Sequence, residues 1–227
     1  MPILLLCMAV PAAALGLLWL ITFPDVSTLR TTNPTTTALI EARQTEADAK
    51  GTNLGRHWVW VPLSRMSPHL RRAVVAAEDA SFFTHEGFDW EGMKDAALYN
   101  LEQGALKRGG STITQQLAKN LFLSGSRTWW RKGQEAVITA MLETVLTKRR
   151  ILEIYLNVAE WGDGVYGADA AARYHFGVPA AALTPAQAAR LAVMLPSPRS
   201  YPPGRDTVYL QQRTATILAR MKYARIP

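Results

Sequence analysis

Two glutamates stand at helix positions where an apolar residue is expected. Glu78 lies four residues after Val74 and four before Phe82, so in a helix the three side chains share one stripe. The stripe that holds Glu135 continues through apolar residues, Ile138, Leu142 and Leu146. A carboxyl group in a low-dielectric environment has a raised pKa unless a cation compensates, and such a group can transfer protons near neutral pH. Glu78 and Glu135 are therefore candidates for general acid–base catalysis.

The same positions also allow a purely structural interpretation. Arg131 precedes Glu135 by four residues, a spacing that permits an ion pair along one helix face. Because structural ion pairs also place carboxylates in unusual environments, spacing alone leaves a catalytic and a structural role open for both glutamates.

A helix with one polar face is predicted between the two glutamates. In the segment 109–123 (GGSTITQQLAKNLFL), Thr112 and Gln115 match a capping box, and Thr112, Gln116 and Lys119 fall on one helix face. The opposite face is apolar, with Ile113, Leu117 and Leu121. Free backbone amides at the helix start and a lysine two turns later would suit a phosphate or pyrophosphate. An ordinary, well-capped surface helix is the alternative.

Other catalytic chemistries lack their sequence signatures. No Ser-x-x-Lys or Gly-x-Ser-x-Gly occurs, so the usual serine acyl-transfer motifs are missing. The four histidines have no partner at metal-ligand spacing, so the residues predict no metal site. Gly110 stands where a phosphate-binding P-loop requires lysine. The single cysteine excludes an intramolecular disulfide.

Helices must position these candidates, because helical patterns fill the chain from residue 58 onward. Apolar periodicity, with Gly pairs, Pro clusters and Ser-rich turns between the segments, predicts helices over 68–83, 90–103, 112–123, 130–146, 148–158, 168–176, 185–195 and 206–223. Residues 41–55 are compatible with a short helix followed by a loop, and only the brief segment 57–63 alternates. The predicted fold class is all-α.

The first 23 residues are predicted to anchor the chain in a membrane. Residues 3–23 carry no charge and would form a helix of about 31 Å, the thickness of a bilayer hydrocarbon core. The alternatives are a cleaved signal peptide, which normally has a shorter apolar region behind basic residues, and a buried core helix. Residues 24–55, rich in Thr and Pro at their start, are predicted to be a linker. Residues 56–227 would then form the catalytic domain.

Five segments resemble, in order, the motifs of a known enzyme family. They are EDASFFTHEG (78–87), GGSTITQQLAKNLFL (109–123), RKGQEAVITAMLE (131–143), KRRILEIYLN (148–157) and GADAAARYHFG (167–177). The chain is thereby similar to the family 51 peptidoglycan glycosyltransferases. At the fifth motif, His175 and Val178 stand where relatives often have Tyr and Lys.

The resemblance implies a lysozyme-like, all-α glycosyltransferase domain behind one N-terminal transmembrane helix. The implied reaction polymerises lipid II: the 4-hydroxyl of the acceptor GlcNAc attacks C1 of the donor MurNAc with inversion, and undecaprenyl pyrophosphate leaves. A lysozyme-like hydrolase is the alternative. It needs no pyrophosphate site, so Lys119 and Arg131 favour the transferase. The presence of both carboxylates argues against a catalytically idle scaffold.

The resemblance also implies roles for individual residues. Glu78 corresponds to the general base that deprotonates the acceptor hydroxyl, and Glu135 to a second carboxylate near the donor sugar and its pyrophosphate. The positions that match phosphate- and sugar-binding residues are Thr112, Gln116, Lys119, Asn120 and Arg131. The positions that match the acceptor side of the first motif are Asp79, Phe82 and His85.

The implied partners are lipid II, the growing glycan strand and the lipid bilayer, with other cell-wall synthesis proteins as further candidates. No cofactor is certain, although a divalent cation, Mg²⁺ or Mn²⁺, would be compatible with the pyrophosphate. The implied location is the cytoplasmic (inner) membrane, crossed once, with the domain on the periplasmic, extracytoplasmic side. The net charge of +7 fits an anionic substrate. A membrane anchor and two catalytic carboxylates argue against a nucleic-acid partner.

Overall fold

The structure, a computed structural model, describes residues 23–105, 109–123, 125 and 128–227. Its α-helices are α2 (Ala38–Ala49), α3 (Pro68–Glu78), α4 (Trp90–Glu102), α5 (Ile113–Phe122), α6 (Trp129–Val145), α7 (Lys148–Val158), α8 (Ala168–Phe176), α9 (Pro185–Met194) and α10 (Val208–Arg220). Short 3₁₀ helices are η1 (Ser27–Arg30), η2 (Leu63–Arg65), η3 (Ala180–Ala182), η4 (Pro198–Ser200) and η5 (Met221–Tyr223). The predicted, mainly helical class is confirmed.

Threonine side chains fix where several helices begin. Hydroxyl groups that accept a backbone N–H three residues further on belong to Thr112, Thr128, Thr147, Thr184 and Thr207. Each of these bonds satisfies one of the amides that a helix leaves unpaired at its start. At α5 the predicted capping box is present, because Gln115 also accepts the N–H of Thr112.

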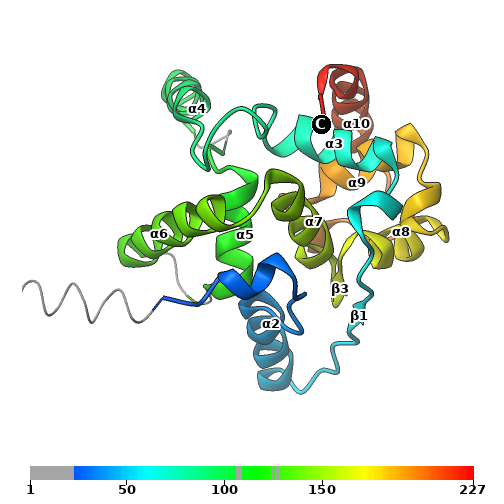
Figure 1. The fold of residues 1–227 in the computed structure, drawn as a ribbon. Helices are drawn as coiled ribbons and strands as arrows, with labels where there is room; N and C mark the ends of the chain where they lie inside the picture. The colour runs from blue at the N-terminus through cyan, green and yellow to red at the C-terminus, as the bar shows by residue number, and fades with distance from the viewer. Residues whose placement is uncertain (1–22, 106–108, 124, 126–127) are drawn as a thin grey trace, which may run out of the picture.

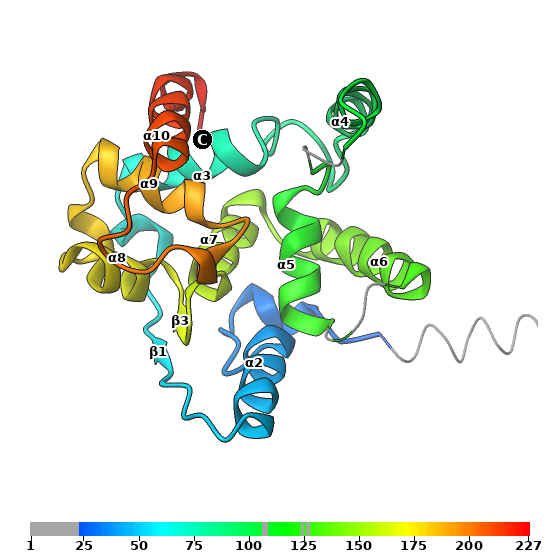
Figure 2. The same cartoon turned by 180° about the vertical axis from the view of Figure 1, so that it is seen from behind.

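Helices α5 and α7 lie near the middle of the domain, and α3, α9 and α10 pack together beside them (Figure 1). Helix α5 contacts α2, α6 and α7, whereas α3 contacts α9 and α10. Side chains with no exposed surface include Leu70, Leu117, Ile151, Leu152 and Leu191. Helix α4 stands at the periphery in both views (Figures 1 and 2). The helices that carry the first two motifs, α3 and α5, are thus held by different neighbours.

Three short strands depart from the all-α prediction. The strands β1 (His57–Trp58), β2 (Glu160–Gly162) and β3 (Val165–Tyr166) form a sheet of order β1-β3-β2. Strand β1 runs parallel to β3, and β2 runs antiparallel to it. Strands of two or three residues are too short to show an alternating pattern, so no pattern indicated β2 and β3.

Parts of residues 24–55, the segment predicted to be a linker, pack against the domain. Val26 and Leu29 lie in the hydrophobic core and are 3% and 7% exposed. The guanidinium of Arg150 in α7 donates to the carbonyl oxygen of Leu29 at 2.8 Å. Helix α2 contacts α5. Because the segment is polar and Thr-rich overall, the sequence pattern did not indicate that its few apolar residues hold it in place.

The predicted membrane anchor, residues 1–23, lies outside the described residues except for Phe23. The side chain of Phe23 is partly buried against the hydrophobic core. No helix within the described ranges combines the length and the apolar character needed to cross a membrane.

Candidate active site

Glu78 is the last residue of α3, and its side chain is partly exposed at the edge of the core. Val74 and Val75, one turn earlier, are 0% and 1% exposed, as the predicted stripe requires. The prediction that this helix continues to residue 83 is wrong, because Asp79 leaves the helical conformation with φ −164° and ψ 79°. Phe82 is still fully buried, but it belongs to the turn after the helix.

The carboxylate of Asp79 joins three parts of the site. It lies 2.9 Å from Nε2 of His85, and it accepts the N–H of Ile113, the first residue of α5, at 3.0 Å. Gly87 N–H donates to Nδ1 of His85 at 3.1 Å, so Nε2 is the nitrogen that carries the proton donated to Asp79. Asp79 also faces the positive end of the α5 dipole. This buried carboxylate therefore fixes the loop after α3 against the start of α5.

The start of α5 is consequently not an open anion site. Asp79 occupies the N–H of Ile113, and Oγ1 of Thr112 accepts the N–H of Gln115 at 3.2 Å. The prediction that free amides here would hold a phosphate is wrong for these two groups, because the protein supplies its own carboxylate and hydroxyl. The Thr112 hydroxyl also donates to the carbonyl oxygen of Gly87 at 2.7 Å. The N–H groups of Ile113 and Gln115 are therefore already bound within the protein.

Gly87 lies in the loop between α3 and α4, directly against α6. Its φ is +88°, and a Cβ atom there would lie 2.9 Å from both Cγ of Glu143 and Cγ2 of Thr139. Glu143 cannot easily move away, because it accepts from Oγ1 of Thr114 at 2.5 Å and from Nζ of Lys148 at 2.7 Å. Both the backbone conformation and the lack of space thus require glycine.

The amide of Gln116 connects Glu78 to α5. Its Nε2 donates to Oε2 of Glu78 at 2.8 Å. Burial raises the pKa of Glu78 above its ordinary value, and adjacent Asp79 adds to the rise, whereas the Gln116 hydrogen bond and the charges of Lys119 and Arg213 oppose it. A carboxyl group of raised pKa that cations still help to ionise has the properties of a general base that works near neutral pH.

The predicted apolar face of α5 is confirmed, and the predicted polar face is confirmed for Gln116 and Lys119 but not for Thr112, which is 1% exposed. Ile113 and Leu117 have no exposed surface, and Leu121 is 6% exposed. On the other face, Gln116 is partly exposed and Lys119 is exposed. Asn120, which the resemblance assigned to substrate binding, is only 8% exposed and lies buried.

Glu135 lies on α6 and is 4% exposed, beside Ile138 at 1%. Its burial therefore agrees with the predicted stripe. The carboxylate forms an ion pair with Nζ of Lys132, one turn earlier, whereas the structural interpretation of the sequence proposed Arg131 as its partner. Arg131 stands in the first turn of α6, where its backbone N–H donates to Oγ1 of Thr128 at 3.2 Å.

Eight of the ten candidates from the sequence fall into two groups, and the other two, Lys119 and Asn120, lie further along α5. The first group is joined by the hydrogen bonds and packing around the end of α3 and the start of α5 and comprises Glu78, Asp79, Phe82, His85, Thr112 and Gln116. The second group lies on α6 and comprises Glu135 and Arg131. The two catalytic candidates bind different partners, since Glu78 accepts from Gln116 and Glu135 from Lys132.

Two residues near Glu78 were missed in the sequence. Tyr155 of α7 is 1% exposed, and its hydroxyl donates to Oε1 of Gln116 at 2.9 Å. Arg213 of α10 contributes a positive charge that lowers the pKa of Glu78. Tyr155 lies inside the fourth of the five segments, which was the available signal. Arg213 lies outside all five, and no pattern indicated it.

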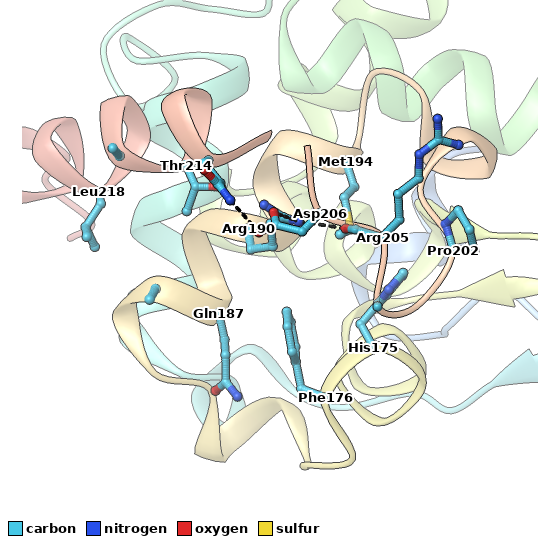
Figure 3. A pocket seen from close by; sticks show the side chains of 14 residues that line it. His175, Phe176, Gln187, Arg190, Met194, Pro202, Arg205, Asp206, Thr214 and Leu218 are labelled. Atoms are coloured by element: carbon cyan, nitrogen blue, oxygen red, sulfur yellow. Dashed lines mark hydrogen bonds and ion pairs between the residues drawn. The ribbon is translucent and has the colours of Figure 1, made fainter. Parts of the chain in front are cut away.

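A cavity of about 620 Å³ opens between α8, α9 and α10, and the candidate catalytic glutamates are not among its lining residues (Figure 3). The unusual His175 of the fifth motif lies on its wall, where Nε2 donates to the carbonyl oxygen of Trp161 at 2.8 Å. Burial lowers the pKa of His175. On the opposite side Arg190 forms an ion pair with Asp206 at 2.7 Å. His175 thus supports the packing of α8 at a distance from the Glu78 cluster.

Comparison with known proteins identifies the family of the chain. A family model described as Transglycosylase matches residues 47–222. The biosynthetic peptidoglycan transglycosylase of Nitrosospira multiformis is 54% identical over 195 residues, covering 86% of this chain and 85% of the relative. The protein of the same name from Azoarcus sp. is 51% identical over 217 residues, covering 95% and 94%. All five segments lie inside the matched region, and the chain belongs to the transglycosylase family.

Proposed function

We propose that this transglycosylase polymerises the glycan chains of peptidoglycan from lipid II and releases undecaprenyl pyrophosphate. One observation carries the proposal: Glu78, a partly exposed carboxyl group of raised pKa, accepts a hydrogen bond from Gln116 on the helix face that also bears Lys119. The names of the relatives, biosynthetic peptidoglycan transglycosylases, point to the same polymer.

In the proposed reaction, Glu78 accepts the proton of the 4-hydroxyl group of the acceptor GlcNAc. The hydroxyl oxygen bonds to C1 of the donor MurNAc from the face opposite the pyrophosphate. The bond from C1 to the pyrophosphate oxygen breaks, its electron pair leaves with undecaprenyl pyrophosphate, and the configuration at C1 inverts. Because burial raises the pKa of Glu78, its carboxylate is a stronger base than that of an exposed glutamate.

The charge that develops on the leaving pyrophosphate is proposed to be met by cationic side chains. Lys119 is exposed on the polar face of α5, and Arg131 stands in the first turn of α6. Fixed cations that face a developing negative charge stabilise the transition state. Since Asp79 already occupies an amide at the start of α5, these side chains take the role that free amides would have. Glu135 is proposed to lie near the donor sugar and to hold this turn of α6 through Lys132.

We also propose a lysozyme-like fold and a location on the periplasmic, extracytoplasmic face of the cytoplasmic (inner) membrane, with residues 1–23 as a single-pass anchor. The mainly helical domain supports the fold, and the exposed apolar side chains of α4 and of the start of α6 support contact with the bilayer. These are Trp90, Leu98, Leu101, Trp129 and Trp130. Tryptophan favours the membrane–water interface. Membrane fractionation of a chain that lacks residues 1–23 tests the anchor, and other cell-wall synthesis proteins remain candidate partners there.

A divalent cation at the pyrophosphate, Mg²⁺ or Mn²⁺, stays a prediction. In the described part of the chain, no three His, Cys, Asp or Glu side chains cluster closely enough to hold a metal ion. Such an ion would therefore take most of its ligands from the phosphates and from water, as Mg²⁺ commonly does. Turnover after treatment with EDTA, and after each ion is added back, tests this prediction.

Incubation of the purified protein with lipid II tests the proposed function. We expect long glycan strands together with undecaprenyl pyrophosphate, and no polymer from Glu78→Gln. Glu41→Gln is the matched control, since Glu41 is an exposed glutamate on α2, and it should polymerise as the wild type does. A protein that shortens preformed strands and makes none from lipid II would instead be the glycan hydrolase.

A further inference from the structure

Three side chains from three helices form a chain of two hydrogen bonds beneath the candidate site. The hydroxyl of Tyr155 on α7 donates to Oε1 of Gln116 on α5 at 2.9 Å. On the other side of the same amide, Nε2 of Gln116 donates to Oε2 of Glu78 on α3 at 2.8 Å. Tyr155 is 1% exposed, so the first of these bonds is shielded from water.

The hydroxyl of Tyr155 favours the same orientation of the amide as the ionised carboxylate of Glu78, and it does so also when Glu78 is protonated. Burial raises the pKa of Tyr155 well above its ordinary value, so the hydroxyl keeps its proton and remains a donor. A donor at this position selects the amide oxygen, which leaves the NH₂ group to face Glu78. The two ends of a glutamine amide are nearly equal in size, so sterics alone would not fix this orientation. Turned around, the amide would place its oxygen against the carboxylate.

Charged and titratable groups from several elements also face Glu78. Lys119 on α5 and Arg213 on α10 favour its ionised form, whereas Asp79, the adjacent residue, disfavours it. Tyr155 on α7 interacts electrostatically with Glu78 as well. The side chains of Lys119 and Arg213 are exposed, so salt in the solution screens the effect of their charges on Glu78. The bond from Gln116 is the short-range contact whose direction the fold can set.

We infer that Tyr155 is a positioning residue of the reaction: it orients the amide of Gln116 so that N–H, and not oxygen, faces the carboxylate of Glu78. This inference rests on the proposed role of Glu78 as general base. It gives both ends of Gln116 a function within the protein, in addition to any contact that the second Nε2 hydrogen makes with substrate.

The pH dependence of Tyr155→Phe tests the inference. The change removes one oxygen atom and keeps the ring, so the amide is free to turn and Glu78 becomes harder to ionise. The acidic limb of the single-turnover rate should move to higher pH by roughly 0.5–1 unit, while the rate on the alkaline side is largely kept. A purely structural tyrosine would lower the melting temperature and leave the acidic limb where it is, and that result would overturn the inference.

Tyr166→Phe is the matched control. Tyr166 is also 1% exposed, but its hydroxyl has no hydrogen-bond partner in the part of the chain that the structure describes. Its removal should leave the pH profile unchanged. An equal shift in Tyr166→Phe would assign the effect to the loss of any buried hydroxyl and would contradict a specific role of Tyr155.

A double variant tests whether Tyr155 acts through Gln116. In a Gln116→Ala background the amide is gone, so Tyr155→Phe should produce no additional shift of the acidic limb. If Tyr155→Phe shifts the limb as far in this background as in the wild type, the hydroxyl acts on Glu78 without the amide, and the inference is wrong.

Two further measurements separate this inference from the proposed function. Carbon-13 NMR of labelled glutamate carboxyl groups follows the titration of Glu78 directly, and its midpoint should rise in Tyr155→Phe whether or not the enzyme turns over. If Glu78→Gln is active, Glu78 is not the general base, but the positioning role is untouched. If the titration midpoint of Glu78 is unchanged in Tyr155→Phe, the positioning role is wrong, but the general base is untouched.

If Tyr155→Phe does not fold, 3-fluorotyrosine at position 155 keeps the hydroxyl and makes it a stronger donor. The Glu78 midpoint should then fall, and a rise would overturn the inference.

Discussion

The pKa of Glu78 is set by effects of its surroundings that oppose one another. Its position at the end of α3 removes water from the carboxyl group, which raises the pKa, while Gln116, Lys119 and Arg213 favour the charged form. A fully buried carboxyl group without these partners would stay protonated, and a fully exposed one would be a weak base. The site therefore needs both the apolar stripe below Glu78 and the polar face of α5 beside it.

Replacing Glu78 with glutamine should abolish polymerisation and stabilise the fold above acidic pH. The amide has nearly the same shape but cannot accept the proton, and loss of a general base costs about 10²–10⁴ in rate. Because the folded-state pKa lies above the ordinary 4.5, the folded protein binds this proton more tightly than the unfolded chain. Wild-type stability therefore falls as pH rises from 4.5 through the raised pKa, and the variant lacks this fall.

Calorimetry of both proteins across this pH range, together with turnover of lipid II, checks the prediction. The melting temperature of Glu78→Gln relative to wild type should increase with pH. Turnover within about tenfold of wild type in the folded variant would remove Glu78 from the mechanism.

Lys119→Ala should slow the chemical step by about 10²-fold or more, as the removal of one transition-state donor does. Its charge also lowers the pKa of Glu78, so the acidic limb of the rate should move to higher pH. Lys119→Arg should restore only part of the rate, because a planar guanidinium does not replace a compact ammonium. Single-turnover rate and melting temperature, measured on one preparation, check this. A destabilised Lys119→Ala protein with normal turnover per folded molecule would exclude the role at the pyrophosphate.

At the scale of elements, the loop from Asp79 to Asp89 connects the end of α3 to α5 and α6 and thereby positions the residues of the site. Asp79 ties it to α5, and Gly87 rests on α6. The loop also carries His85, whose Nε2 lies 2.9 Å from Asp79. Its correct placement therefore depends on two neighbouring helices at once.

Gly87→Ala should destabilise the fold by about 1–3 kcal/mol and lower turnover. The new Cβ would lie 2.9 Å from atoms of Glu143 and Thr139, and the loop that holds His85 would have to move. Gly51→Ala is the control for backbone strain alone, since Gly51 has φ +65° and no atom within 4 Å of its added Cβ. Urea unfolding and turnover are measured for both variants. Equal losses of stability and turnover in Gly87→Ala and Gly51→Ala would show that the contact with α6 is unimportant.

Helix boundaries were predictable where the signals are local. Apolar periodicity and the turn residues between segments located α5, α6, α7 and α9 to within one residue, and the stripes correctly predicted that Glu135 would be buried. The end of α3 was missed, because Asp79 leaves the helix to bind His85 and Ile113, and Ile113 lies far along the sequence. Tyr155 and Arg213 were missed for the same reason: their effect on Glu78 exists only after α7 and α10 have packed.

At the scale of the whole molecule, parts of the segment 23–55 pack against the core of the catalytic domain. Val26, Leu29 and Ile40 are all less than one-tenth exposed. Arg43 of α2 forms an ion pair with the buried carboxylate of Glu160 in β2 at 2.8 Å. These contacts connect the N-terminal segment to the core and to the small sheet.

A chain that begins at residue 23 should therefore fold, whereas one that begins at residue 56 should be less stable by several kcal/mol. Each fully buried aliphatic side chain contributes roughly 1.5–3 kcal/mol, and Val26, Leu29 and Ile40 would all be lost. The shorter chain would also leave Glu160 buried without Arg43, which is costly. Urea unfolding of the two chains measures the difference. Equal midpoints would restore the interpretation of residues 24–55 as a linker.

The packing of α10 against α3 has a consequence for how the enzyme is made. Synthesis runs from the N-terminus, so Glu78 emerges from the ribosome well before Arg213, by several seconds at about 5–20 residues per second. All five motifs are complete by residue 177, yet the helix that brings Arg213 to the carboxylate is still missing at that point. A nascent chain, or one whose translation stops early, can therefore carry every motif of the family and still lack the finished environment of its base.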